Sequence, residues 1–393
     1  LEELINQDEN LNKLILKQEQ IAKIEQKANE ELRDSISESQ KVVGILKDYL
    51  SEYMTSELAP GLIEQIKNLE NALEKKNKDD LIQAKNDAVS FIDKNILETI
   101  LQKFSELRVC VIGDAILDNY VQSVPLGISS EAPVMVVNQQ SEKKFSGGAA
   151  VVAKHISALK SKSHLISVVG SDPEAETILE EMKKAKVTFE NFSEEGRPTT
   201  LKTRYLVGEQ KVFRVSRLID KQIEEVTKEK ILNYLEANFN KFDRFIFSDF
   251  SYGLLSDNLM KTFSKKFSNY FDQISGDSQS GSQRGNLEQF SNFNCIFPTE
   301  NEARIDISDK VCSIETLGWK LIEKLNNNHV FMKLGKDGLL VFNKKDRSKI
   351  YCTSFANKVV DVSGAGDALL SLASLSLSIN KDPKYAAFLG SVA

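Results

Sequence analysis

The sequence predicts an α/β fold with a mainly parallel central sheet, helices on both faces and a small β lid, preceded by an all-helical segment. Three observations lead to this prediction. From residue 96 onward, short apolar or β-branched runs alternate with helical patterns. Two β-rich stretches interrupt that alternation without a following helix. Residues 1–94 instead carry Leu and Ile at helical spacing among Glu, Lys, Gln and Asn.

Bulk composition excludes several classes of protein. The 393 residues suffice for one large α/β domain and an appendage, and the net charge of −6 gives no basic surface for nucleic acid. No apolar run is long enough to span a bilayer, and no signal peptide is present, so we expect a cytoplasmic protein without a membrane partner. Four scattered cysteines and three histidines do not form a zinc pattern, which favours free thiols.

Residues 1–94 are predicted to form a helical hairpin, a small bundle or a coiled coil. They contain no candidate catalytic cluster, so we expect a spacer or a segment that adds self-association. The α/β part is assigned to residues 95–393. The chain begins with Leu and its last helical pattern ends at Ala393 without a cap, so we expect a fragment of a longer protein, truncated at the C-terminal side.

Within residues 95–393 the expected elements follow in order. Strands are expected at 108–112, 164–169, 245–248, 295–297, 330–334 and 339–342, and helices at 96–107, 151–159, 174–184, 257–267 and 314–325. The stretches 132–139 and 199–215, the second with a turn at Gly208, are assigned to the lid. The polar run 275–285 is interpreted as a solvated linker, with Asp277 as a candidate at the pocket entrance.

The stretch 357–379 carries the first chemical signal. A β-branched run at 358–362 precedes the turn Ser363–Gly366, and a helical pattern starts at Asp367. A helix N-terminus with glycines suits a phosphate, and an adjacent carboxylate could accept the proton of an attacking hydroxyl. The alternative is that Gly364 and Gly366 only make a tight turn and Asp367 only caps the helix.

Carboxylates at a strand end give the second signal. The first strand ends at Gly113 and Asp114, with Asp118 four residues later, and ligands bind outside the carboxyl ends of strands in open α/β sheets. These carboxylates suit a polyhydroxylated ligand. Asp114 could equally cap the following turn, whereas no cap explains Asp118.

Two further glycine turns are less specific. Gly147 and Gly148 open the next helix and would let backbone N–H groups approach a substrate oxygen, although close helix packing explains the two following alanines. The turn from Lys333 to Gly338 could form a shelf beside a nucleotide. Neither a G-x-x-x-x-G-K-[ST] loop nor a G-x-G-x-x-G fingerprint occurs in the chain.

The motifs GDAILD, SGGAA, TTLKTR, SDFSYG, FPTENE, LGKDG and DVSGAGD occur in this order, and the chain from about residue 96 to 393 resembles the ribokinase-like (PfkB) carbohydrate kinases. Within that family, GDAILDNYV, GISSEAPVMVV, SGGAAVVAKHI and TTLKTRYL are most similar to the bacterial heptose-phosphate kinases, which make precursors of ADP-heptose.

The resemblance implies a role for each matching residue. Asp367 matches the catalytic base, and the anion hole matches Gly364, Ala365 and Gly366. The sugar site matches Asp114, Asp118, Gly147 and Gly148. A phosphate already on the sugar would meet Lys202 and Arg204 on the lid. The nucleotide site matches Lys333, Gly335 and Gly338, and Glu302 matches a glutamate linked to magnesium through water.

The resemblance also implies ATP-dependent phosphorylation of a heptose 7-phosphate of the D-glycero-D-manno type, with Mg²⁺ and, as a further candidate, a monovalent cation. It implies a homodimer formed through the lid. Three departures bear on the sugar: Thr299 replaces an asparagine, Val151 and His155 replace two more, and Ser216 replaces an aspartate. The alternatives are a kinase for ribose, fructose phosphate or a nucleoside, a non-catalytic sugar or nucleotide binder, and a scaffold that works through its N-terminal helices.

Overall fold

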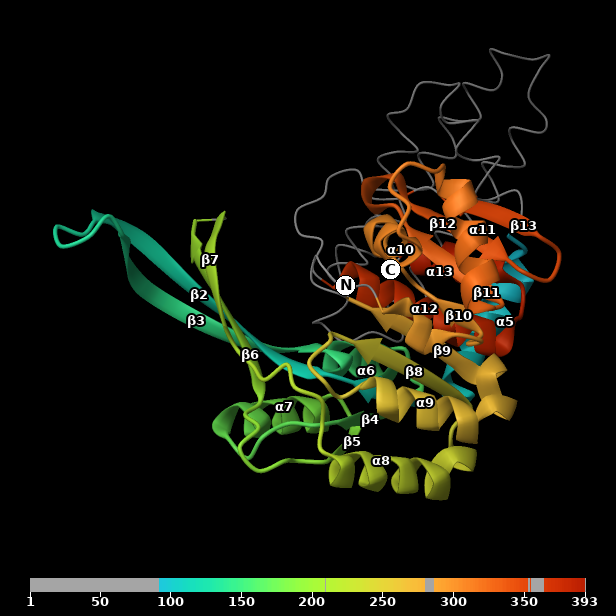
Figure 1. The fold of residues 1–393 in the computed structure, drawn as a ribbon, viewed down its shortest axis with the longest axis horizontal. Coiled ribbons are helices and arrows are strands. Elements are labelled where there is room, and N and C mark those ends of the chain that lie inside the picture. The colour runs from blue at the N-terminus through green and yellow to red at the C-terminus, as the bar shows by residue number, and fades with distance from the viewer. Residues whose placement is uncertain (1–91, 209, 280–285, 353, 355–363, 393) are drawn as a thin grey trace, which may run out of the picture.

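The computed structural model describes residues 92–208, 210–279, 286–352, 354 and 364–392 (Figure 1). The expected helices before residue 92 and the strand expected at 358–362 lie outside the described residues. None of the described helices is long and apolar enough to cross a membrane.

The described residues form a central sheet in the order β13-β12-β11-β10-β9-β8-β1-β4-β5. All the strand pairings from β11 to β5 in this order are parallel. The two remaining pairings, β11 with β12 and β12 with β13, are antiparallel. The predicted mainly parallel α/β fold is therefore confirmed. The strands are β1 (Arg108–Gly113), β4 (Lys162–Ser167), β5 (Thr188–Asn191), β8 (Arg244–Asp249), β9 (Ile274–Ser278), β10 (Cys295–Ile296), β11 (His329–Lys333), β12 (Leu339–Asn343) and β13 (Ser348–Cys352).

Helices cover both faces of this sheet, because successive side chains of each buried strand point to opposite sides. Val109 and Val111 of β1 belong to one hydrophobic core, and Cys110 and Ile112 belong to the other. The first core includes side chains of α5 (Lys94–Lys103), α6 (Ala149–Ala158), α7 (Pro173–Lys184), α12 (Ala365–Ile379) and α13 (Pro383–Val392). The second includes side chains of α8 (Glu225–Asn238), α9 (Asp257–Lys266), α10 (Glu300–Ile307) and α11 (Ile314–Leu325).

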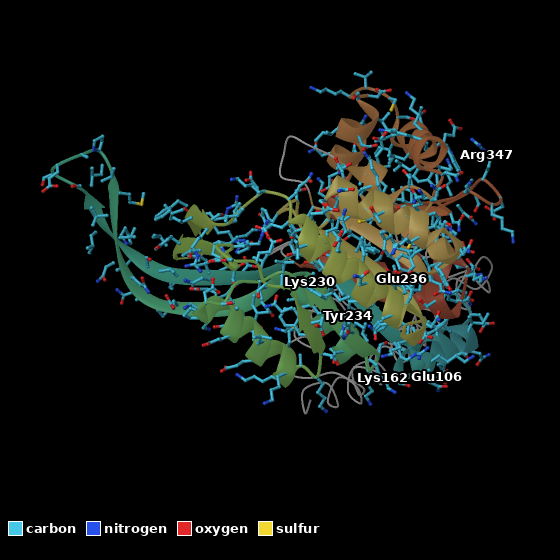
Figure 2. All side chains as sticks on the ribbon, turned by 60° about the horizontal axis from the view of Figure 1, so that its bottom comes forward. Glu106, Lys162, Lys230, Tyr234, Glu236 and Arg347 are labelled. Atoms are coloured by element: carbon cyan, nitrogen blue, oxygen red, sulfur yellow. The ribbon has the colours of Figure 1, made fainter. Side chains whose placement is uncertain are left out.

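A second sheet contains the two stretches assigned to the lid. Its order is β3-β2-β6-β7, with β2 (Ala115–Ile128), β3 (Met135–Gly148), β6 (Thr200–Val207) and β7 (Gln210–Arg217). The β2–β3 hairpin projects from the body as a long arm (Figures 1 and 2). Strand β2 was not expected, because it begins almost directly after β1 ends at Gly113 and because it contains Pro125 and Gly127.

The interpretation of residues 275–285 as a solvated linker is wrong for its first part. Residues 275–278 belong to β9, a buried strand between β8 and β10. Small polar residues are needed there because neighbouring groups leave no room. The Ser374 hydroxyl of α12 lies 2.8 Å from that of Ser275, and a Cβ on Gly276 would come within 2.6 Å of the Phe290 ring. Residues 280–285 lie outside the described part of the chain.

Candidate active site

The N-terminus of α12 presents an open backbone cradle. Gly364 adopts a left-handed conformation with φ of 87°, which favours glycine, and a Cβ placed there would meet nothing within 4 Å. The helix begins at Ala365, so its first amides have no partner within the helix. Ala365 and Gly366 therefore offer N–H groups and the positive end of the helix dipole to an anion.

Asp367 lies in the first turn of α12 and is only 5% exposed. Burial, reinforced by the negative charge of Asp277, raises the pKa of its carboxyl group to about 7. The side-chain amide of Gln279 donates a hydrogen bond of 3.0 Å to its Oδ1. A carboxylate with a pKa near neutrality can accept a proton at physiological pH. The N-cap residue of α12 is Gly364, which has no side chain, and the described partner of the Asp367 carboxylate is Gln279.

Two side chains from the ends of β11 and β9, the strands on either side of β10, form an ion pair close to the start of α12. The Lys333 ammonium at the end of β11 donates to both carboxylate oxygens of Asp277 on β9, at 2.9 and 3.1 Å. The expectation that Asp277 lines the pocket entrance needs refinement, because its side chain is buried in an ion pair. Sequence reasoning missed this pair because β9 was assigned to a linker.

Glu302 lies at the start of α10 in a capping box. Its Oε2 accepts the amide of Thr299 at 2.7 Å, and the Thr299 hydroxyl accepts the amide of Glu302 at 3.2 Å. Thr299 thus has a structural role at the position where the family carries asparagine. Burial raises the pKa of Glu302, and the positive charge of Lys333 opposes that rise.

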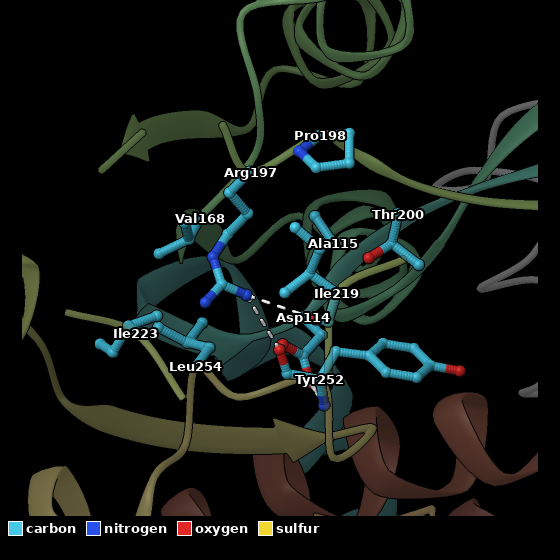
Figure 3. A pocket seen from close by; sticks show the side chains of 10 residues that line it. All are labelled: Asp114, Ala115, Val168, Arg197, Pro198, Thr200, Ile219, Ile223, Tyr252 and Leu254. Atoms are coloured by element: carbon cyan, nitrogen blue, oxygen red, sulfur yellow. Dashed lines mark hydrogen bonds between the residues drawn. The ribbon is translucent and has the colours of Figure 1, made fainter. Parts of the chain in front are cut away.

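Asp114 lies on the other side of the site, after β1. Its Oδ2 accepts the amides of Phe250 and Tyr252 at 3.0 and 3.3 Å, so it holds the loop that follows β8. Burial and the nearby charge of Asp249 raise the pKa of Asp114 to about 7. Together with Arg197 and Tyr252 it lines a small pocket (Figure 3).

The two glycines of β3 lie against the aspartates, Gly147 against the Asp118 carboxylate and Gly148 against the Asp114 backbone. Asp118 on β2 forms an ion pair with Arg204 on β6. A Cβ on Gly147 would lie 2.3 Å from the Asp118 Oδ2, so a larger residue would displace that carboxylate. Gly148 has φ of 63°, and its Cβ would lie 2.2 Å from the Asp114 carbonyl oxygen. The glycines therefore let both aspartates approach β3.

Three cations gather at the root of the lid. Lys202 is 8% exposed, and its ammonium lies 5.0 Å from the ring centroids of Phe250 and Tyr252. Burial, together with the positive charges of Arg204 and Arg214, lowers its pKa to about 8. Arg204 lies directly opposite Arg214 across the β6–β7 pair. Sequence reasoning missed Arg214, which only the hairpin register brings to this place.

The two halves of the site are electrostatically connected. The negative charge of Asp118 contributes to the raised pKa of Asp367, after burial and the charge of Asp277. The turn at Gly335 and Gly338 has the expected place between β11 and β12, with positive φ at both glycines. The arrangement offers an anion cradle beside a basic carboxylate, facing a second cluster of carboxylates and cations.

A family model for pfkB family carbohydrate kinases matches residues 106–393. The chain belongs to this family. Similar curated relatives are the bifunctional protein HldE of Nitratiruptor, 30% identical over 291 residues, and that of Helicobacter pylori J99, 29% identical over 283 residues. These matches cover 73% and 71% of this chain and 60% of each relative. The chain therefore spans about 60% of the length of the curated relatives it matches.

Solved structures of a ribokinase and a phosphofructokinase share the fold. Ribokinase from Thermotoga maritima superposes with a TM-score of 0.56 at 20% identity, covering 72% of this chain and 90% of that one. Phosphofructokinase-2 from Escherichia coli gives a TM-score of 0.58 at 14% identity, covering 72% and 92%. The expected ribokinase-like fold is confirmed.

Proposed function

We propose that this pfkB-family chain transfers the γ-phosphoryl group of ATP to a hydroxyl of a sugar phosphate, with a heptose 7-phosphate of the D-glycero-D-manno type as substrate. Family membership supports the kinase reaction. The HldE relatives and the GDAILDNYV and TTLKTRYL motifs support the heptose branch. ADP-heptose synthesis is the pathway we propose for this activity.

Asp367 is the proposed base. The sugar hydroxyl oxygen forms a bond to the γ-phosphorus, the bond from that phosphorus to the β–γ bridging oxygen breaks, and Asp367 accepts the hydroxyl proton. Negative charge spreads over the phosphoryl oxygens during the transfer. The N–H groups of Ala365 and Gly366, with the open turn at Gly364, stabilise that charge because they are fixed before the reaction.

The described residues of this site offer few direct ligands for Mg²⁺. Among the described residues, no three His, Cys, Asp or Glu side chains are grouped to ligate a metal ion. The buried Glu302 could instead hold Mg²⁺ through water, as expected for an ion that is ligated mainly by water and nucleotide phosphates. When bound, the ion would neutralise phosphate charge. Gly335 and Gly338 are the proposed shelf for the nucleotide.

The cation cluster at the lid root is the observation that carries the proposal of a phosphorylated sugar. The positive charges of Arg204 and Arg214 both lower the pKa of Lys202, while the negative charges of Asp118 and Asp114 oppose them. Asp118 also forms an ion pair with Arg204. Like charges directly opposite in a sheet are unfavourable unless an anion lies between them. A phosphate on the sugar would be such an anion, while the Asp118 and Asp114 carboxylates would accept sugar hydroxyls.

The test is ADP release with ATP, Mg²⁺ and a panel of acceptors: heptose 7-phosphate, unphosphorylated heptose, fructose 6-phosphate, ribose and a nucleoside. We expect the highest kcat/KM with heptose 7-phosphate. Arg204→Ala should raise KM at least tenfold, mainly for phosphorylated sugars, since one charge-assisted contact to the phosphate is lost. Arg217→Ala is the matched control, because Arg217 pairs with Glu174 away from the cluster. Turnover of another acceptor alone would contradict the heptose assignment, and no ADP release with any acceptor would favour a binding protein.

A further inference from the structure

Lys333 forms an ion pair with Asp277 that is almost completely buried. Its side chain crosses the end of β10, which separates β11 from β9, to reach Asp277. Only 14% of the Lys333 side chain and 1% of the Asp277 side chain are exposed. A buried ion pair contributes little net stability, because both charges lose their hydration. A contribution to stability therefore does not explain this ion pair.

The ammonium lies against the anion cradle. A Cβ placed on Gly366 would be 3.5 Å from the Lys333 Nζ, and that distance is an ordinary contact. The absence of a side chain at Gly366 thus leaves the ammonium facing the first turn of α12. An anion bound to the amides of that turn would lie next to Lys333.

The surroundings keep Lys333 charged. Burial alone would lower its pKa, but the carboxylates of Asp277, Glu302 and Asp367 together raise it. These groups come from β9, α10 and α12, so three different elements direct negative charge at one ammonium. The side chain is an ammonium at neutral pH, and its reach is fixed by the two hydrogen bonds to Asp277.

We propose that Lys333 contacts the phosphoryl group during its transfer from ATP to the sugar, with Asp277 as the residue that positions it. This inference rests on the proposed kinase function and changes the role of Lys333 from a shelf for the nucleotide to a cation at the reacting group. A fixed ammonium stabilises the charge of the transferring group more than that of the ground state, because no reorganisation is needed.

The test compares Lys333→Met with Lys345→Met, whose lysine is exposed in the turn between β12 and β13, outside the proposed nucleotide shelf. Binding is measured by calorimetry with Mg²⁺–ADP alone and with Mg²⁺–ADP, aluminium fluoride and sugar phosphate, which together mimic the transferring phosphoryl group. For Lys333→Met we expect ADP affinity within about threefold of wild type and a loss of about a hundredfold in affinity for the mimic. Lys345→Met should match wild type in both. Lys333→Arg, which keeps the charge, should retain more of the affinity for the mimic than Lys333→Met.

Two results would overturn the inference: an unchanged affinity of Lys333→Met for the mimic, or an equal loss of affinity for the mimic and for ADP alone. Thermal unfolding of each variant shows whether it folds. If Lys333→Met does not fold, Lys333→Gln, which keeps polar length without charge, carries the same expectation. Failure of the proposed function is distinguishable, because wild type would then release no ADP with any acceptor, whereas failure of this inference leaves wild-type turnover intact.

Discussion

Asp367 combines a buried carboxyl group with a position beside the first amides of α12, which have no partner within the helix. Since the pKa of Asp367 is raised to about 7, its basic form is lost as the pH falls below neutrality. We expect kcat/KM to fall about tenfold per pH unit below that value. Asp367→Asn should reduce kcat by about a hundredfold or more while leaving ADP affinity unchanged. Activity of Asp367→Asn near that of wild type would remove Asp367 from the role of base.

The same pKa shift predicts a change in stability. A carboxyl group whose pKa is higher in the folded than in the unfolded chain binds more protons when folded, so stability falls as the pH rises from about 4 to about 7. Asp367→Asn removes this penalty. We expect the variant to be more stable than wild type by about 2–4 kcal/mol at pH 8 and nearly equal to it at pH 4. Urea unfolding at both pH values measures this, and an equal difference at the two pH values would contradict it.

Gln279 is the residue whose effect on Asp367 is simplest to isolate. Its amide hydrogen bond favours the charged form of the carboxyl group and so lowers the pKa of Asp367. The charge of Lys333 also lowers this pKa, whereas burial and the charges of Asp277 and Asp118 raise it. Gln279→Leu should therefore move the acidic limb of the kcat/KM profile upward by about half a pH unit to one unit. Gln289→Leu, which removes a hydrogen bond to Asp249 instead, is the control and should leave that limb in place.

The sequence predicted the roles of single residues where a short motif determines the local backbone structure. The GAGD run indicated both the helix start and the carboxylate in its first turn, because turn and helix are local. Asp277, Gln279 and Arg214 were assigned no such roles, since their places depend on strand order and hairpin register. These long-range relations are not encoded in any short spacing.

At the scale of elements, the junction between β3 and α6 joins the sugar side of the site to the sheet. Gly148→Ala should lower the free energy of unfolding by at least about 2 kcal/mol, because the methyl group would meet the Asp114 backbone and φ is positive. Gly196→Ala is the control, with φ of 74° but open space around the added Cβ, and should cost about 1 kcal/mol. Chemical unfolding of both variants measures the difference, and equal losses would show that the close approach is unimportant.

Elements with strong periodicity were predictable, and those with small residues were not. The helix expected at 314–325 is α11, since Leu317, Leu321 and Leu325 define its buried face. Strand β9 was interpreted as a loop because its Ser and Gly residues have low β propensity. Packing against α12 and Phe290 overrides that propensity, and only the tertiary structure shows it.

At the scale of the whole molecule, the arm leaves apolar side chains uncovered. Leu126, Ile128 and Met135 are 65%, 78% and 60% exposed near its tip. We propose that a second copy of the chain covers them, in line with the expected homodimer through the lid. Leu126→Glu should shift the chain towards monomer in sedimentation velocity runs, while Val311→Glu, at a 94% exposed site away from the arm, should not. A monomeric wild type at micromolar concentration would contradict the proposal.

The most direct test of the phosphoryl-transfer account is a crystal structure with a non-hydrolysable ATP analogue and heptose 7-phosphate. The account predicts terminal phosphate oxygens on the amides of Ala365 and Gly366, and one sugar hydroxyl within hydrogen-bond distance of both the Asp367 carboxylate and the γ-phosphate. A terminal phosphate bound elsewhere, or Asp367 without contact to any acceptor hydroxyl, would contradict it.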